Sequence, residues 1–364
     1  MLWQRAGVSL PCRMAMFLAG FPVSVPVHTV NRQCCSGLQA VAQVAAAIRG
    51  GLITVGIAGG VESMSTNPMP AKNWQEPVNP RLAGNQGALD CLLPMGIAAS
   101  ENVAARFGVS RQEQDEFAAA SHRKAAAAQA AGKFQQEIVP VPTLLKDAST
   151  GEERQVVLDR DDGIRPGTTP ASLAQLKPAF KQGGSTTAGN SSQMSDGAAA
   201  LMLMTRSEAA RRGLPVLGVF KSFAAVGVPP AILGIGPTVA IPAALEKAGI
   251  GPEDVAVYEI NEAFASQAAY CVRCLGLDPA KVNPNGGAIA LGHPLGCTGA
   301  RQVVTLLHEL QRRGRTARFG VVSMCIGSGM GAAAVFERGD GADAMPRRPM
   351  FTQRTGLSCD AAVN

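Results

Sequence analysis

The feature that most constrains the fold is the junction between the run Val23–Val30 and the residues that follow it. Val23–Val30 predicts a strand, and beyond Gly37 apolar residues recur at the spacing of a helix. The turn between them carries Cys34 and Cys35. A cysteine at such a junction lies beside unpaired backbone N–H groups and the positive end of a helix dipole, which stabilise a thiolate. The junction therefore predicts an α/β fold with a cysteine of this pair as a candidate nucleophile, and a buried structural cysteine is the alternative.

The rest of the chain alternates apolar strands with helices, which is the pattern of an α/β protein with buried sheets. Ile53–Ala58 and Val216–Phe220 are continuous apolar runs, as expected for strands covered on both faces. A weak internal echo indicates a duplicated design. A Val-Asn pair, a glycine turn and a helix that ends in Arg-Gly occur in residues 30–51 and again in residues 282–314.

Composition excludes several classes of protein. Aromatic residues make up 4% of the 364 residues, too few to stack on nucleic-acid bases, although the net charge is +6. Every apolar stretch is interrupted before the ~18–20 residues that a membrane span requires. The nine cysteines lack the spacing of a disulfide framework, which favours a reducing compartment. Cys271 and Cys274 form a CxxC pair without a second Cys/His pair, so they predict helix packing and no metal site.

Other ionisable residues have simpler interpretations. The densest basic cluster, Arg312–Arg318, favours a solvated helix end, where positive charge suits the dipole, over an anion site. Of the four histidines, His28 is expected to be structural within the predicted strand. His122 and His308 are expected to be solvated on helices beside charged residues.

Three downstream segments place reactive side chains in or beside turns. One follows an apolar strand, one is a glycine-rich turn, and one lies between two apolar strands. The segments are Tyr258–Phe264, with Asn261 and Glu262 after an apolar strand; Asn283–Arg301, with His293 in a Gly-Pro turn; and Met324–Gly331, with Cys325 between the strands Phe319–Ser323 and Ala332–Phe336.

With residues 186–200, which read TTAGNSSQMSDGAAA, these motifs resemble the thiolase family, most closely the plant-type peroxisomal 3-ketoacyl-CoA thiolases. The resemblance covers roughly Arg13 to Asp340. It implies an α/β thiolase fold with two similar halves, each built on a buried five-stranded sheet, and an inserted loop domain that covers the substrate. It also implies that the first half is incomplete, because family members carry a further N-terminal segment ahead of the matched region.

The resemblance suggests a division of the chain into five segments. Within the second of them, Ser100–Gly132 predicts a pair of helices and Val139–Asp161 predicts short strands. The segments are residues 1–64, the remnant of the N-terminal half with the nucleophile; 65–189, the inserted loop domain; 190–213, the return to the N-terminal half; 214–340, the C-terminal half; and 341–364, a tail expected to be disordered.

The activity implied by the resemblance is thiolytic cleavage of a 3-ketoacyl-CoA by CoA, as in fatty-acid beta-oxidation. Cys34 matches the family nucleophile that carries the acyl group, and a thiolate suits this role. His293 matches the base, and Cys325 the second cysteine, which exchanges protons with the enolate and with CoA. Asn261 holds a water in one oxyanion hole with His293, and the N–H groups of Cys34 and Gly327 form the other.

The resemblance also implies the contacts with CoA. Arg165 matches the residue on the adenine, Ser172 and Ser192 match contacts to the pantetheine or nucleotide part, and Met95 lies near the acyl thioester. CoA is then a substrate and no cofactor is needed. The expected assembly is at least a homodimer, without nucleic acid or membrane partners, located in the peroxisome by resemblance.

Alternatives remain open at this point. Another enzyme on the same fold is one: a biosynthetic acetoacetyl-CoA thiolase, against which Pro94 argues modestly, or a ketoacyl synthase, against which Cys325 argues. A different class of function is an inactive truncated chain that only associates with full-length subunits. Cys35 is either a harmless small residue or an off-pathway thiol, and Glu262 either orients the site or is structural.

Overall fold

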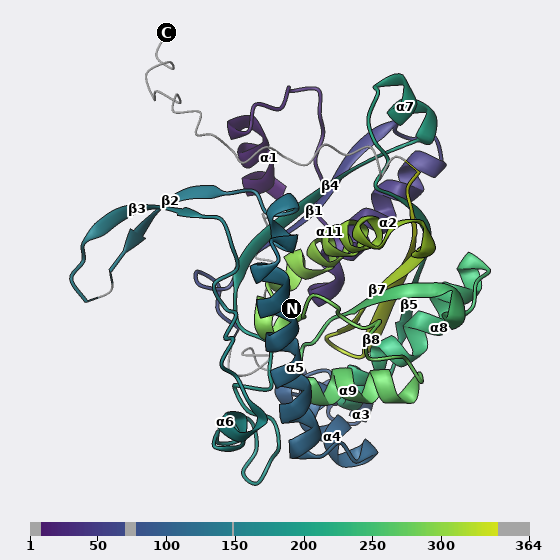
Figure 1. Ribbon diagram of the computed structural model, residues 1–364. Coiled ribbons are helices and arrows are strands. Elements are labelled where there is room, and N and C mark those ends of the chain that lie inside the picture. The colour runs from purple at the N-terminus through teal and green to yellow at the C-terminus, as the bar shows by residue number, and fades with distance from the viewer. Residues whose placement is uncertain (1–8, 70–77, 148, 341–364) are drawn as a thin grey trace.

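The computed structural model describes residues 9–69, 78–147 and 149–340. Two sheets with helices packed on them form its body, and a β-hairpin projects from one side (Figure 1). The α/β class predicted from the sequence is confirmed. The predicted disordered tail, residues 341–364, lies outside the described residues.

The larger sheet has the strand order β5-β8-β7-β6. β5 with β8 and β8 with β7 are antiparallel pairs, whereas β7 with β6 is parallel. Every residue of β7 is buried, which explains its unbroken apolar sequence. The strands are β5 (Gly218–Gly227), β6 (Val255–Ile260), β7 (Phe319–Ile326) and β8 (Met330–Arg338).

Helices cover both faces of this sheet. α8 (Gly236–Ala248) packs on the face that includes Val321, and α11 (Leu295–Arg313) packs on the face that includes Val322. Among the described residues, Pro230–Ala248 is long and apolar enough to cross a membrane by length and composition. Half of that segment is buried against the sheet, as in the core helix of a globular domain.

The smaller sheet pairs β1 (Val55–Ser63) with β4 (Asp196–Met204) in antiparallel register. α2 (Ser36–Arg49) and α11 lie between the two sheets, and one apolar cluster includes residues of both helices and both sheets. α11 therefore has sheets on two sides, and 14 of its 19 residues are buried.

The segment between β1 and β4 forms helices and a β-hairpin. Ser110 caps α5 (Arg111–Ala130) by accepting a hydrogen bond from the Glu113 N–H, and Thr169 caps α6 (Pro170–Ala174) in the same way. The helices and strands predicted from Ser100–Gly132 and Val139–Asp161 are present. They comprise α4 (Asn102–Phe107), α5, and the hairpin of β2 (Val141–Lys146) and β3 (Glu153–Leu158).

Shorter helices complete the described chain. Gly108 and Gly249 end α4 and α8 in the left-handed conformation, which glycine adopts without strain. The remaining helices are α1 (Ser9–Leu18), α3 (Gln86–Asp90), α7 (Arg206–Arg211), α9 (Ala265–Cys274) and α10 (Ala288–Leu291).

Two expectations about strands were wrong. Val23–Val30 forms no strand, because Pro26 lacks the N–H group that a ladder needs and the described residues bring no partner strand to this run. The five-stranded sheets are also not observed in the described residues, which form sheets of four and two strands. Val282 reaches the edge of the larger sheet but makes only a single bridge, to Tyr258.

The contact between α8 and β8 yields a stability prediction. A Cβ atom built on Gly331 would lie 2.3 Å from the Gly236 carbonyl oxygen, so Gly331→Ala forces two backbones apart. We expect a loss of about 1–3 kcal/mol in the free energy of unfolding, measured by urea denaturation. Gly227→Ala on β5 is the matched control, because its Cβ would meet nothing within 4 Å. Equal midpoints for the two variants would contradict the packing.

Candidate active site

Cys34 lies in the short 3-10 turn η1 (Gln33–Cys35), immediately before α2. Its side chain is buried, and the backbone N–H groups of Gly327 and of Cys34 itself point to the sulfur. Burial raises the pKa of Cys34 to about 11 and outweighs these N–H groups, which lower it. Cys34 is therefore a thiol at neutral pH, although it lies at the start of a helix.

The turn between β7 and β8 brings Cys325 and Gly327 to Cys34. Gln33 Nε2 donates to Ser328 Oγ at 3.1 Å, which ties the nucleophile turn to this one. A Cβ on Gly327 would lie 1.8 Å from Gln33 Oε1, so the contact requires glycine. Burial raises the pKa of Cys325 well above its usual value, and the neighbouring Cys34 raises it further. Both thiols are therefore buried, and they are close enough for the charge of Cys34 to affect the pKa of Cys325.

His293 enters from the turn between α10 and α11. Its Nε2 lies 3.2 Å from Asn261 Nδ2, and its Nδ1 lies 2.6 Å from Thr298 Oγ1. Gly292 has a φ of 89°, and a Cβ there would lie 2.1 Å from Ser195 Oγ, so the turn requires glycine. Asn261 follows β6, and its N–H donates to Ser323 O on β7 at 2.9 Å. The sheet edge therefore sets the position of the amide that meets the histidine.

Burial and, to a smaller extent, the positive charge of Arg301 together lower the pKa of His293 to about 3. The imidazole is neutral at physiological pH and can accept a proton. Leu295, two residues after His293, packs against Cys34 and Met64 in one apolar cluster. The His293 turn and the Cys34 turn are thus neighbours in the fold.

The four residues predicted to contact CoA fall in two groups. Met95 packs in the cluster that includes Cys325, and the Ser192 N–H donates to Ala263 O, two residues after Asn261. The exposed Ser172 uses its hydroxyl in the capping box of α6, and Arg165 is also exposed, with its N–H bound to His122 Nδ1. Met95 and Ser192 therefore lie beside the catalytic cluster, whereas Arg165 and Ser172 lie on the exposed surface.

The expectations for the other histidines were wrong. His122 and His308 are only 3% and 5% exposed, because α5 packs under the 162–166 segment and α11 lies between two sheets. His28 is exposed and lies in no strand. The basic helix end is also more than solvated, since Arg312 and Arg313 both form ion pairs with Glu309. Helical spacing alone does not reveal how many sides of a helix are covered.

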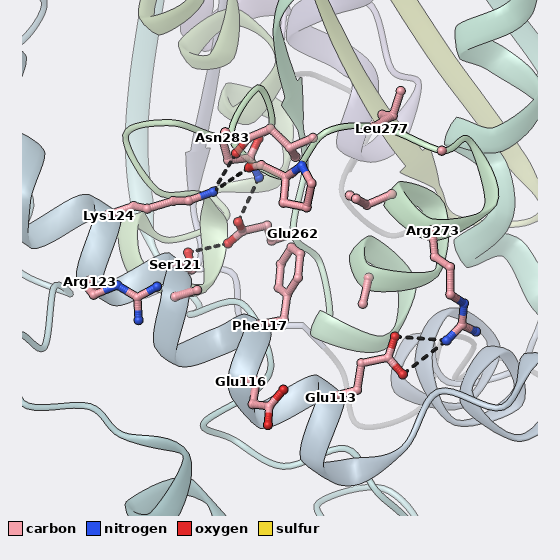
Figure 2. A pocket seen from close by; sticks show the side chains of 17 residues that line it. Glu113, Glu116, Phe117, Ser121, Arg123, Lys124, Glu262, Arg273, Leu277 and Asn283 are labelled. Atoms are coloured by element: carbon pink, nitrogen blue, oxygen red, sulfur yellow. Dashed lines mark hydrogen bonds and ion pairs between the residues drawn. The ribbon is translucent and has the colours of Figure 1, made fainter.

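Glu262, which follows β6, links the end of this strand to α5 through hydrogen bonds. Its carboxylate accepts hydrogen bonds from Ser121 Oγ at 2.6 Å and from Asn283 Nδ2 at 2.8 Å (Figure 2). It forms part of the lining of a cavity of about 580 Å³ between α5 and α9. Lys124 also lines this cavity, and its Nζ donates hydrogen bonds to the carbonyl oxygens of Pro279 and Val282 (Figure 2). Cys34, His293 and Cys325 do not line this cavity. The contacts of Glu262 are therefore those of a structural residue that holds the Asn283 turn and α5 in place.

Comparison with known proteins accounts for this arrangement. The model of the thiolase N-terminal domain matches residues 1–207, and that of the thiolase C-terminal domain matches residues 214–338. The chain belongs to the thiolase family. The resemblance inferred from the motifs is confirmed.

Similar proteins include peroxisomal 3-ketoacyl-CoA thiolase 2 of Arabidopsis thaliana, with 64% identity over 96% of this chain and 75% of that protein. Peroxisomal 3-ketoacyl-CoA thiolase B of Mus musculus is 61% identical over 90% of this chain and 76% of its own length. The crystal structure of the dimeric peroxisomal thiolase of Saccharomyces cerevisiae has a TM-score of 0.81 and 50% identity, and the match covers 90% of this chain and 80% of that one.

Two residues that the motifs did not single out complete the site of this thiolase. Thr298 contacts His293 directly, and Arg301 affects its pKa. Both lie in the Asn283–Arg301 motif, so their proximity to His293 in sequence was the available signal. In the described ranges, no group of three or more His, Cys, Asp or Glu side chains is placed to hold a metal ion.

The buried neutral His293 predicts a specific acid sensitivity. Its pKa is about 3 in the folded protein and 6.5 ordinarily, so the unfolded state binds more protons between these values. This contribution to stability is present above pH 6.5 and is lost as the pH falls toward 3. His293→Gln should reduce the slope of unfolding free energy against pH by about 1.4 kcal/mol per pH unit between pH 4.5 and 6.

Urea denaturation at several pH values measures this slope. His28→Gln, which changes an exposed histidine, is the matched control and should keep the slope of the unmodified protein. An unchanged slope in His293→Gln would mean that the imidazole is not held neutral.

Proposed function

We propose that this chain catalyses the thiolytic cleavage of 3-ketoacyl-CoA by CoA, which gives acetyl-CoA and a shortened acyl-CoA. The reaction passes through an intermediate in which the acyl group is bound to Cys34. The observation that carries the proposal is the placement around Cys34 of the Gly327 N–H and the neighbouring Cys325, and of a turn that holds the His293–Asn261 pair and packs Leu295 against Cys34, in a chain of the thiolase family. The names of its similar proteins support the same reaction.

In the first half-reaction, Cys34 gives its proton to His293 and the sulfur attacks the 3-keto carbonyl carbon. The bond between C2 and C3 breaks, which leaves the acyl group on Cys34 and the enolate of acetyl-CoA. Cys325 protonates this enolate, so that acetyl-CoA departs and Cys325 becomes a thiolate.

In the second half-reaction, the Cys325 thiolate takes the proton of the CoA thiol. The CoA sulfur attacks the thioester on Cys34, acyl-CoA leaves, and His293 returns its proton to Cys34. All protons and bonds balance over the two steps, and CoA is the only added reactant. Cys325 must exchange protons in both directions, which a thiol does by losing and regaining the hydrogen of its S–H group.

Two sets of donors fit the oxyanions that form. The N–H groups of Cys34 and Gly327 point to the Cys34 sulfur, so they are placed to donate to the oxygen of a carbonyl that this sulfur attacks. Asn261 Oδ1 is buried and has no hydrogen-bond partner among the described residues, so it is available to hold the water of the second hole. Met95 beside Cys325 fits contact with the acyl thioester.

The setting we propose is fatty-acid beta-oxidation in the peroxisome, with the chain acting as a homodimer. The names of the plant and mouse relatives support the compartment and the substrate class, and the dimeric yeast enzyme supports the assembly. Arg165, Ser172 and Ser192 remain proposed contacts of CoA.

The nucleophile is tested by substitution of each member of the cysteine pair. Cys34→Ala should lower thiolysis of acetoacetyl-CoA by roughly 10³-fold or more, since groups that act as a unit fail together. Cys35→Ser, which changes the fully buried neighbour, is the matched control and should remain active. A radiolabelled acyl group trapped on Cys35, with Cys34→Ala still active, would refute the assignment.

The second cysteine is tested by separating the two half-reactions. Cys325→Ser should form the acyl-enzyme on Cys34 from acyl-CoA but should lose at least about tenfold in overall turnover, because proton exchange at the enolate and at CoA fails. Mass spectrometry of the acylated protein and steady-state rates measure the two effects. Turnover close to that of the unmodified enzyme would make Cys325 a packing residue.

A further inference from the structure

The side of His293 that faces away from Asn261 has a partner of its own. Thr298 lies in the first turn of α11, and its Oγ1 is 2.6 Å from His293 Nδ1. The threonine is 1% exposed and the histidine 5% exposed, so water does not substitute for this contact. The same hydroxyl donates to the Pro294 carbonyl oxygen at 3.2 Å.

These contacts form a chain of hydrogen bonds in which the donor and the acceptor of each bond can be assigned. The Asn261 amide N–H points to His293 Nε2, which must then be the acceptor. The proton of the neutral imidazole is therefore on Nδ1 and is donated to Thr298 Oγ1. The Thr298 hydroxyl hydrogen is used in turn for the Pro294 carbonyl. The tautomer of a histidine is set by the partner of its other nitrogen, and here that partner is a hydroxyl.

We propose that Thr298 is a positioning residue that holds His293 with the proton on Nδ1, so that the lone pair of Nε2, which accepts the Asn261 N–H in the resting site, is the one that receives the proton of Cys34. The role in proton transfer rests on the proposed function, whereas the tautomer itself does not. A hydroxyl suits a base that must release its proton again, because a neutral partner accepts the Nδ1–H without stabilising the imidazolium as a carboxylate would.

The tautomer is measured directly by ¹⁵N NMR of protein labelled at histidine, with His293→Gln to assign the signals. We expect the unmodified protein to show a protonated Nδ1 and an unprotonated Nε2. In Thr298→Val the hydroxyl is absent, and the proton should move to Nε2, where the Asn261 amide can turn its oxygen to accept it. Thr298→Ser keeps the hydroxyl and should keep the Nδ1–H tautomer.

Kinetics with acetoacetyl-CoA and CoA give the second readout. Thr298→Val should lower kcat by about 10–100-fold with KM within about threefold, since the base is in the wrong form while the substrate contacts remain. Thr298→Ser should restore kcat to within about threefold. Thr305→Val is the matched control, because Thr305 is equally buried on α11 and its hydroxyl bonds Glu137, away from His293.

Three results would overturn the proposal: an Nε2–H tautomer in the unmodified protein, an unchanged tautomer in Thr298→Val, or equal losses of kcat in Thr298→Val and Thr305→Val. The first needs no variant at Thr298, so it decides the question even if Thr298→Val does not fold. Absence of thiolysis in the unmodified chain would refute the proposed function and would leave the NMR result as the test of the positioning role.

Discussion

The close approach of α2 and α11 is the constraint on which the site depends. A Cβ on Gly37 would lie 2.7 Å from the Ala300 backbone nitrogen, and one on Gly299 would lie 2.5 Å from the Leu38 nitrogen. The two helices therefore meet backbone to backbone, and only glycine at both positions permits it. Since Cys34 precedes α2 and His293 precedes α11, this contact brings the two turns together between the sheets.

Burial then determines the protonation states in this cluster. It raises the pKa of the Cys34 thiol to about 11 and lowers that of His293 to about 3, so both groups are neutral before substrate binds. A thiolate–imidazolium pair is thus not preformed, and the N–H groups of Gly327 and Cys34 act when negative charge develops during the reaction. The charge of Arg301 and the neutral hydroxyl of Thr298 work in the same direction, because neither stabilises the imidazolium.

The sequence singled out candidate residues better than the surroundings that tune them. Cys34, His293, Cys325 and Asn261 each lie in a local motif. The structure packs Leu295 of the His293 turn against Cys34 and places Asn261 against His293, and the catalytic roles stay a prediction. Thr298 was overlooked although it lies in the same motif as His293, since a threonine on a helix has no spacing signal. His122 and His308 were mistaken for solvated residues, because the alternation of charged and apolar neighbours does not show that a second layer covers the helix.

The sequence by itself determined the α/β class and the family, because both follow from local patterns that the chain carries wherever it folds. Only the tertiary structure decided that Val23–Val30 is no strand, since a strand needs a partner strand. It also decided that Val282 pairs with β6 through a single β-bridge, to Tyr258, and not as a full strand. It further decided the protonation state of His293 and the partners of its two ring nitrogens. Burial, the Arg301 charge and the Thr298 hydroxyl act on His293 through space, and those distances exist only after α2 and α11 have packed between the sheets.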